Sequence, residues 1–258
     1  MNLPETITYE TDGHVATIAF NRPDAHNAMT AEMMAGLEEA FEAFNADDDL
    51  WVAILTGTGE KAFCAGADLG QLIPLMVDSG LESFLGDPTK RFFSDIYKPI
   101  ICAVNGLCIA GGLEIMQGTD LRIAAEHATF GLGEVRWGII PAGGSHVRLP
   151  RQIPWAVAME ILLTGQPITA ERAYDIGLVN KVVPASELIT EARALAEVIC
   201  RNGPIAVRTA KEIAVRSLSL ETPFVLESLL VQRVFGTEDA REGPKAFMEK
   251  RRPKFTGS

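Results

Sequence analysis

The 258-residue chain has few of the residues that build metal centres or disulfide frameworks. It contains four cysteines and four histidines, and the cysteines show no C-x-x-C spacing. The sequence therefore predicts reduced thiols in the core and no metal site. The chain also lacks a G-x-G-x-x-G fingerprint, and Gly112 stands where a Walker A motif requires lysine. We therefore expect no nicotinamide, flavin or other separate cofactor.

Basic residues are outnumbered by acidic ones, 23 Lys and Arg against 34 Asp and Glu, which gives a formal net charge of −11. This excess argues against a broad nucleic-acid surface, because non-specific affinity comes from neutralising phosphates with Lys and Arg. The bases that are present gather near the C-terminus, at Lys245, Lys250, Arg251, Arg252 and Lys254. They fit a solvated helix end that complements its dipole, or a local contact with one anionic ligand.

Long apolar segments are absent as well. No apolar run reaches about 18 residues, the length that indicates a membrane-spanning helix. Residues 1–5 show neither the basic start nor the apolar stretch of a signal peptide. We therefore expect a soluble, cytoplasmic protein with no membrane partner.

Apolar runs with β-branched residues predict strands over residues 14–20, 51–56, 99–104, 119–125 and 178–183. Helical spacing predicts one helix from Thr30, as N-cap, to Asn45, and a shorter one from Thr169 to a stop at Gly177. Strands that alternate with helices in this way indicate an α/β fold with a substantially parallel arrangement.

The last part of the chain is predicted to be helical. Its apolar surface is broad enough to exceed what one subunit can cover, at Phe224, Leu226, Leu229, Leu230 and Val234. Earlier in the chain, residues 71–97 lack clean periodicity but carry many apolar side chains. We interpret that segment as a pocket cover rather than a linker, with ordinary packing as the alternative.

Three segments carry the candidate chemistry. In residues 105–114 an apolar run breaks at Gly111 and Gly112 into a helix, which leaves backbone N–H groups free to hold developing negative charge beside Glu114. A second turn of small residues at 61–69 can donate N–H groups to the same pocket. Residues 130–144 add a second carboxylate, Glu134, in a glycine-rich setting.

Each of these features also has a structural explanation. The two glycines can serve only close packing of a helix on a strand. Glu114 can be a first-turn carboxylate favoured by the helix dipole, and Glu134 can form a surface ion pair with Arg136. The combination of two turns and two glutamates favours a catalytic constellation.

Taken in order, these segments resemble the crotonase superfamily, also called the enoyl-CoA hydratase/isomerase family. The resemblance begins with N-R-P-D-A-H-N-A at residues 21–28, continues through the segments above and ends with E-G-P-K-A-F-M-E-K-R at residues 242–251. It implies a crotonase-like ββα spiral core with an acyl-CoA site over residues 1–195. A C-terminal helical trimerisation region would follow over residues 196–258, giving a homotrimer or homohexamer.

The resemblance implies an enoyl-CoA hydratase of fatty acid metabolism, in which coenzyme A is part of the substrate. The backbone N–H groups of Ala67 and Gly111 would form the oxyanion hole for the enolate. Glu114 would accept a proton from the attacking water, and Glu134 would deliver one to the α-carbon. Substrate contacts are implied for Ala65, Asp68, Leu69, Trp137 and Lys250. Residues 71–97 would set the preference for acyl chain length.

The chain departs from the family pattern in places. Asp24 and Gly70 stand where many hydratases carry bases for the CoA phosphates, and Arg22, Lys90, Arg91 or the C-terminal bases could replace them. Pro141-Ala142-Gly143-Gly144 differs from the common P-G-x-G-G run.

Three functions stay open at this point. The first is hydration, or dehydration by the reverse step, and residues 148–154 look like those of carnitinyl-CoA dehydratases. The second is isomerisation of a 3-enoyl-CoA to the 2-enoyl form by one glutamate. The third is a non-catalytic acyl-CoA-binding homologue. A serine triad has no local support, so His146 is predicted to be structural.

Overall fold

The computed structural model describes residues 3–68, 70–72 and 87–257. The larger of its two sheets has six strands in the spatial order β1-β2-β3-β5-β7-β10. These strands are β1 (Ile7–Asp12), β2 (Val15–Phe20), β3 (Val52–Gly57), β5 (Ile100–Val104), β7 (Leu121–Ala125) and β10 (Lys181–Val183). Only the β1–β2 pair is antiparallel, and the other neighbours in this sheet run parallel.

The smaller sheet has the order β4-β6-β8-β9. It consists of β4 (Ala62–Cys64), β6 (Leu107–Ile109), β8 (Thr129–Gly131) and β9 (Ile168–Thr169). Each of β3, β5 and β7 in the larger sheet is followed along the chain by a strand of the smaller one. After β5–β6 and β7–β8 a helical segment comes next, which gives ββα units stacked through parallel pairing. The predicted α/β class and ββα spiral core are confirmed.

The helices supply the outer layers. They are α1 (Ala31–Ala46), α4 (Gly111–Gln117), α5 (Ser145–Gln152), α6 (Trp155–Thr164), α7 (Ala170–Asp175), α8 (Leu188–Cys200), α9 (Pro204–Ser217), α10 (Glu221–Phe235) and α11 (Glu238–Met248), with short 3-10 turns η1 (Pro23–Ala25), η2 (Glu134–Trp137) and η3 (Ala185–Glu187). Both predicted N-caps are present, because Thr30 Oγ1 accepts the N–H of Met33 and Thr169 Oγ1 that of Arg172, each at 3.2 Å.

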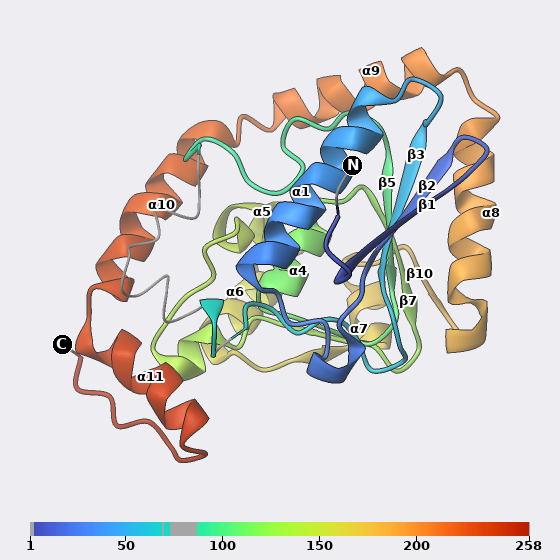
Figure 1. Cartoon of the computed structure of the whole chain (residues 1–258). Coiled ribbons are helices and arrows are strands. Elements are labelled where there is room, and N and C mark those ends of the chain that lie inside the picture. The colour runs from blue at the N-terminus through green and yellow to red at the C-terminus, as the bar shows by residue number, and fades with distance from the viewer. Residues whose placement is uncertain (1–2, 69, 73–86, 258) are drawn as a thin grey trace.

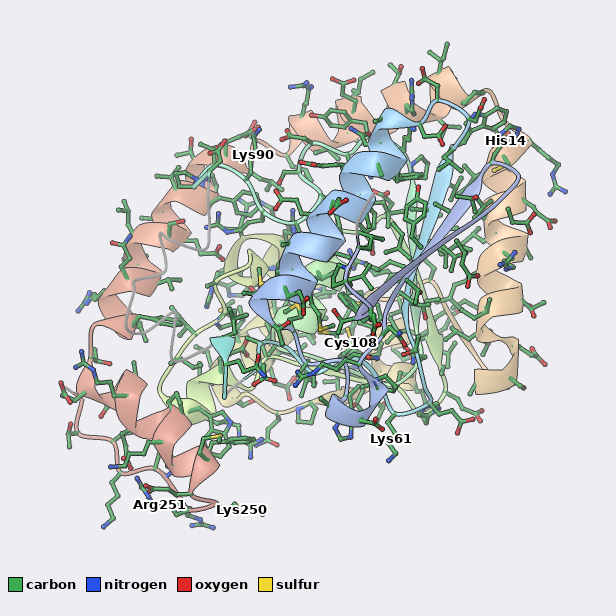
Figure 2. The ribbon with its side chains drawn as sticks, viewed as in Figure 1. His14, Lys61, Lys90, Cys108, Lys250 and Arg251 are labelled. Carbon is green, nitrogen blue, oxygen red and sulfur yellow. The ribbon has the colours of Figure 1, made fainter. Side chains whose placement is uncertain are left out.

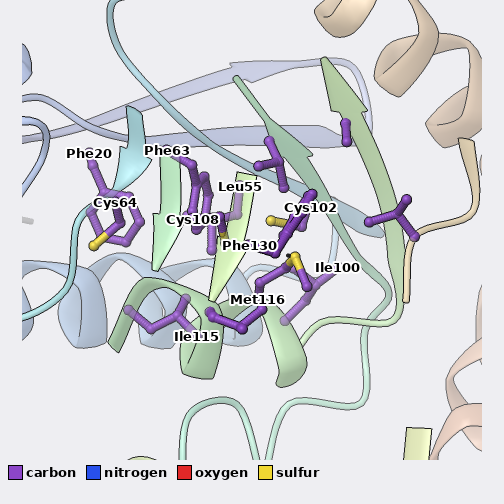
Figure 3. Close-up of a cluster of buried hydrophobic side chains, with 14 of the residues drawn as sticks. Phe20, Leu55, Phe63, Cys64, Ile100, Cys102, Cys108, Ile115, Met116 and Phe130 are labelled. Atoms are coloured by element: carbon purple, nitrogen blue, oxygen red, sulfur yellow. Dashed lines mark hydrogen bonds between the residues drawn. The ribbon is translucent and has the colours of Figure 1, made fainter. Parts of the chain in front are cut away.

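The larger sheet is covered on both faces, which explains its near-continuous apolar strands. On one face, residues of β3, β5 and β7 pack against Leu188, Ala192 and Ala196 of α8. The opposite face packs toward α1 and α4, and Figure 1 shows the sheet between these two helices and α8. The close-up in Figure 3 shows part of that core, including Cys64, Cys102 and Cys108, all buried free thiols. Each fully buried large apolar side chain contributes about 1.5–3 kcal/mol.

Several predicted strand boundaries are wrong. The strand expected over 119–125 begins at Leu121, since residues 119 and 120 form the turn in which the N–H of Thr119 donates to Met116 O. The strand expected over 178–183 begins at Lys181. Strand β1 was not predicted, because it is an edge strand with three consecutive exposed polar residues and no clean alternation.

The C-terminal helices α9, α10 and α11 follow α8 in an arc that passes over the top of the molecule and down its left side in the view of Figure 1. The predicted boundary between residues 1–195 and 196–258 falls inside α8. The apolar surface expected on α10 divides in two: Phe224 is buried, whereas Leu226, Leu229 and Leu230 are exposed. The pocket cover expected over residues 71–97 lies largely at 73–86, outside the described residues.

Candidate active site

Two turns of small residues meet at one end of the smaller sheet. Met29 bridges the first turn, because its N–H donates to Gly66 O and its carbonyl accepts the N–H of Asp68, both at 2.8 Å. The second turn is anchored by the N–H of Ala110, which donates to Gly131 O at 2.9 Å. A Cβ built on Gly66 would lie only 3.2 Å from Gly111 N. The two turns therefore approach as closely as a glycine at position 66 (φ 89°) permits.

The backbone N–H groups of Ala67 and Gly111 are available as donors, since neither has a recorded acceptor within the described part of the chain. Ala110 has φ 53° and ψ −129°, a conformation that is rare for a residue with a side chain. Such backbone strain costs on the order of 1–3 kcal/mol and is typical of functional sites. The ψ angle of Ala110 orients the peptide plane that carries the Gly111 N–H.

Glu114 lies in the first turn of α4, and its residue surface is only 5% exposed. Its Oε1 accepts the N–H of Gly143 at 2.7 Å and the N–H of Ser145 at 3.2 Å. Burial, with the nearby charge of Glu227, raises the pKa of Glu114 to about 7. The two backbone hydrogen bonds and His146 act in the opposite direction. The carboxyl is thus held in one orientation and titrates near neutrality.

Glu134 is the first residue of η2, and its Oε2 is enclosed without a hydrogen-bond partner among the described residues. Burial and the charge of Glu114 raise the pKa of Glu134 to about 8. Arg136 is exposed, and the stem of its side chain packs on Gly165, where a Cβ would lie 2.9 Å from Arg136 Cγ. No Glu134–Arg136 ion pair is recorded in the described chain, so the alternative considered from the sequence is wrong.

Asp68 stabilises the first turn. It forms an ion pair with Arg22 at 2.6 Å, and its Oδ1 accepts the N–H groups of Gly70 and Gln71 at 2.9 and 3.1 Å. Burial acts to raise the pKa of Asp68, but these partners outweigh it and hold the pKa below its ordinary value. Ala65 is tied to the loop before α1 through its N–H, which donates to His26 O at 3.1 Å. Leu69 lies outside the described residues.

Trp137 and Lys250 lie toward the C-terminal helices. The indole ring of Trp137 packs edge-to-face on Phe247 of α11, with centroids 4.9 Å apart, and against the cluster around Val231 and Ile139. Lys250 is exposed just beyond the end of α11, beside Arg251 (Figure 2). Their substrate contacts stay predictions.

Half of the bases considered for CoA phosphates have carboxylate partners, and Arg22 with Asp68 is one of them. Lys90 pairs with Asp95 at 2.6 Å. Arg251 pairs with Glu242 and Glu249. The side chain of Arg91 is 2% exposed and bound to Glu227, so it is not available to a phosphate and that suggestion is wrong.

Glu227 is the residue near Glu114 that sequence reasoning missed. It lies on the buried face of α10 with Phe224 and Val231, at helical spacing. An acidic residue on an otherwise apolar face is the signal that could have identified it, because Glu is rarely buried unless paired.

A cavity of about 240 Å³ lies elsewhere, between the end of α5 and helices α9 and α10. Its lining includes Arg148, Arg151, Lys211 and Phe224 but neither Glu114 nor Glu134. No cluster of His, Cys, Asp or Glu that could hold a metal ion occurs in residues 3–68, 70–72 and 87–257. Over the same residues, no helix combines the length and apolarity needed to cross a membrane.

Comparison with known proteins agrees with this arrangement. Residues 10–258 match the family model described as enoyl-CoA hydratase/isomerase. The chain is 40% identical to enoyl-CoA hydratase EchA19 of Mycobacterium tuberculosis, over 95% of this chain and 94% of that protein. It is 42% identical to (E)-benzylidenesuccinyl-CoA hydratase of Thauera aromatica, over 98% and 99%.

The fold is similar to that in a crystal structure of carnitinyl-CoA hydratase from Mycobacterium avium, with a TM-score of 0.88 and 36% sequence identity. The match covers 99% of this chain and 100% of that one. The sequence matches, the shared fold and the paired turns and glutamates lead to one conclusion. The chain belongs to the enoyl-CoA hydratase/isomerase family, the crotonase superfamily, whose named relatives include hydro-lyase enzymes.

Proposed function

We propose that this protein adds water across the 2,3 double bond of an acyl-CoA thioester, or removes it in the reverse direction. One observation carries the proposal. The pKa values of Glu114 and Glu134 are both raised toward neutrality, with the charge of Glu114 acting on Glu134, and the two turns that carry the free N–H groups of Ala67 and Gly111 lie against each other. This is the arrangement that general acid–base chemistry on an activated carbonyl compound needs.

In the hydration direction, Glu114 as carboxylate accepts a proton from water while the water oxygen bonds to the β-carbon. The electron pair of the double bond moves toward the thioester carbonyl, whose oxygen becomes negative. The N–H groups of Ala67 and Gly111 stabilise that charge, a contribution of about 3 kcal/mol for each such donor. Glu134, protonated, then delivers its proton to the α-carbon. Each hydration thus leaves Glu114 protonated and Glu134 ionised, and proton exchange resets the pair.

The raised pKa values support this division of roles. At pH 7 to 8 a pair of coupled carboxyls shares protons, so that one member is ionised while the other is protonated. An isomerase requires a single glutamate to move the proton, and a non-catalytic binder requires neither. The burial of both carboxyls, which costs folding stability, therefore favours hydration over these alternatives.

The proposal extends to the class of acyl group and to the assembly of the protein. Relatives are named for enoyl-CoA, benzylidenesuccinyl-CoA and carnitinyl-CoA, so the family accommodates different acyl groups. We place the CoA phosphates near the C-terminal bases, with Lys250 as one contact. The protein would act in the cytoplasm as a homotrimer or homohexamer, without a separate cofactor.

A spectroscopic screen of the purified protein against 2-enoyl-CoAs of several chain lengths, carnitinyl-CoA and a 3-enoyl-CoA tests the function. We expect loss of the conjugated thioester absorbance with formation of a 3-hydroxyacyl-CoA. Conversion of the 3-enoyl substrate alone, without hydration of any 2-enoyl-CoA, would establish the isomerase instead. Binding without turnover of any of these thioesters would establish the non-catalytic alternative.

A further inference from the structure

A buried polar cluster connects the C-terminal helix α10 to the turn that holds Glu114. Glu227 Oε2 accepts the Nε–H of Arg91 at 3.1 Å, and both side chains are almost fully buried. Glu227 Oε1 faces His146 Nδ1 at 3.4 Å and has no hydrogen bond within the described residues. His146 belongs to the first turn of α5, directly after Ser145, whose N–H binds Glu114.

Arg91 fixes this cluster in place. Its Nη2 donates to Ser228 Oγ at 2.7 Å and to Phe224 O at 3.1 Å. The guanidinium also lies over the ring of Phe224, 5.2 Å from its centroid. Helix α10 is therefore attached to the segment before β5 by several hydrogen bonds, and these hold the Glu227 carboxyl in one orientation.

The catalytic turn is in direct contact with this cluster. A Cβ built on Gly144, which has φ 107°, would meet Arg91 Cγ at 3.1 Å and Phe224 Cε1 at 3.2 Å. Gly143 and Ser145, on either side, donate the two N–H groups that orient Glu114. Gly144 therefore links α10 to the hydrogen bonds of Glu114, because it packs against Arg91 and Phe224 and lies between the two donors.

We propose that Glu227, paired with Arg91 and facing His146, is a positioning residue of the hydration site that fixes the Gly143–His146 turn and supplies a negative charge beside Glu114. The inference rests on the proposed function, because it assigns Glu227 a part in the same reaction. Glu227 itself does not touch the reacting atoms in this account. The C-terminal helix then contributes to the active site of its own chain as well as to assembly.

The charges around Glu114 give this role a measurable consequence. The charged and titratable groups that face the site are Glu134 from η2, Glu227 from α10, His146 and Arg148 from α5, and Arg91 from the segment before β5. Among these, Glu227 raises the pKa of Glu114 and His146 lowers it, with Glu227 having the larger effect. Removing the Glu227 charge must therefore lower the pKa of Glu114.

The test uses the full-length chain with Glu227→Gln, which keeps the side-chain shape and removes the charge. Glu227→Asp keeps the charge, and Glu221→Gln makes the same change at an exposed position of the same helix. The protonated Glu114 carboxyl is followed by difference infrared titration, assigned by its loss in Glu114→Gln. We expect Glu227→Gln to lower the titration midpoint by about half a pH unit or more, while Glu227→Asp and Glu221→Gln stay close to wild type.

Hydration kinetics give a second readout. We expect Glu227→Gln to move the acid limb of the kcat/KM profile to lower pH and to reduce kcat about tenfold, with KM nearly unchanged. A folded Glu227→Gln protein whose infrared midpoint and pH profile coincide with wild type overturns the proposal. If no enoyl-CoA is hydrated by wild type, the proposed function fails, and the infrared midpoint alone decides the role of Glu227.

Glu227→Gln leaves Arg91 buried without a carboxylate, which can prevent folding. In that case the double variant Arg91→Met with Glu227→Met replaces it, since it removes both charges together and keeps apolar volume. The expected result is again a lower infrared midpoint, because Glu227, and not Arg91, is among the groups that shift the pKa of Glu114. A midpoint equal to wild type in the double variant also overturns the proposal.

Discussion

Burial sets the acid–base properties of Glu114 and Glu134, since it raises the pKa of both carboxyls and the charge of Glu114 raises that of Glu134 further. Glu114 retains two backbone hydrogen bonds that favour its ionised form, whereas Glu134 Oε2 has none within the described residues. This difference supports the proposed base role of Glu114 and acid role of Glu134.

Replacing either carboxyl by its amide tests this division. We expect Glu114→Gln and Glu134→Gln each to reduce kcat by at least about a hundredfold with little change in CoA-ester binding, because proton transfer is lost while volume is kept. Steady-state kinetics together with calorimetric binding of a CoA ester measure both quantities. Glu126→Gln, an exposed glutamate after β7, is the matched control. Hydration at the wild-type rate by Glu134→Gln would rule out the two-carboxylate mechanism.

The same burial predicts a pH-dependent stability. The pKa of Glu114 is about 7 in the folded protein, above its ordinary value of 4.5. A raised carboxyl pKa means that the folded state is favoured when the group is protonated, and this advantage is lost as the pH rises from about 4.5 through 7. Glu114→Gln should thus be more stable than wild type at pH 9, by on the order of 2–3 kcal/mol, and similar at pH 4.5.

Denaturant unfolding at the two pH values measures this difference, again with Glu126→Gln as the control. Equal stabilities of wild type and Glu114→Gln at pH 9 would mean that the carboxyl is better solvated in the native protein than the structure indicates.

The sequence was sufficient to select both glutamates as candidates, because each stands in a local glycine-rich segment that can be recognised without tertiary contacts. Glu227 could not be found in the same way. Its partners Arg91 and His146 lie 136 and 81 residues away in the chain, and only the packing of α10 against α5 brings them together. For the same reason, the sequence did not reveal that Arg91 is paired with Glu227 and is therefore not free to bind a phosphate.

Among the elements, α4 and β4 show how closely helix and strand must approach to place the oxyanion donors. A Cβ on Gly112 would overlap the backbone carbonyl of Cys64, whereas a Cβ on Gly111 would meet chiefly the terminal methyl of Met29. The second obstacle is the end of a flexible side chain and can move. The close-packing explanation considered from the sequence therefore applies to Gly112, whereas Gly111 stays free for the proposed donor role.

This contrast predicts different outcomes for two neighbouring substitutions. Gly112→Ala should destabilise the protein by about 2 kcal/mol or more, because the backbone of β4 must shift to remove the overlap. Gly111→Ala should fold with a smaller loss, since Met29 can adjust. Chemical denaturation of both variants measures the difference. If Gly111→Ala proved the more damaging of the two, the assigned roles would have to be exchanged.

The elements also show where sequence patterns fail. The helix cap at Thr30 and the stop at Gly177 were predictable, because they depend on side chains and φ values within a few residues. The start of β10 was not, since Leu178 and Val179 are buried without strand pairing and their N–H groups both donate to Ala173 O. The apolar residues at 178 and 179 are therefore explained by burial and not by membership of a strand.

For the whole molecule, the C-terminal helices have two different faces. The inner face of α10 carries Phe224, Glu227 and Val231 against its own chain, while Leu226, Leu229 and Leu230 are 56, 59 and 50% exposed. Helix α11 packs on η2 of the same chain, where a Cβ on Gly243 would overlap the carbonyl of Trp137. Deleting α11 would thus remove packing within the subunit, so a point substitution is the cleaner probe of assembly.

We expect sedimentation of the intact protein to show a trimer or hexamer at micromolar concentration, since three exposed leucines on one helix form a surface suited to another subunit. Leu229→Asp combined with Leu230→Asp should shift the protein to smaller species. Leu163→Asp on α6, which replaces a leucine that is 74% exposed, is the control. A wild-type monomer would contradict the assembly while leaving the glutamate chemistry intact.

Hydration of a 2-enoyl-CoA in heavy water, followed by mass spectrometry and NMR of the product, tests the two-glutamate mechanism. We expect one deuterium bound to the α-carbon and a hydroxyl on the β-carbon in wild type. Both should be nearly lost in Glu114→Gln and in Glu134→Gln and retained in Glu126→Gln. Wild-type yields of the deuterated 3-hydroxyacyl-CoA from either glutamine variant would contradict the account.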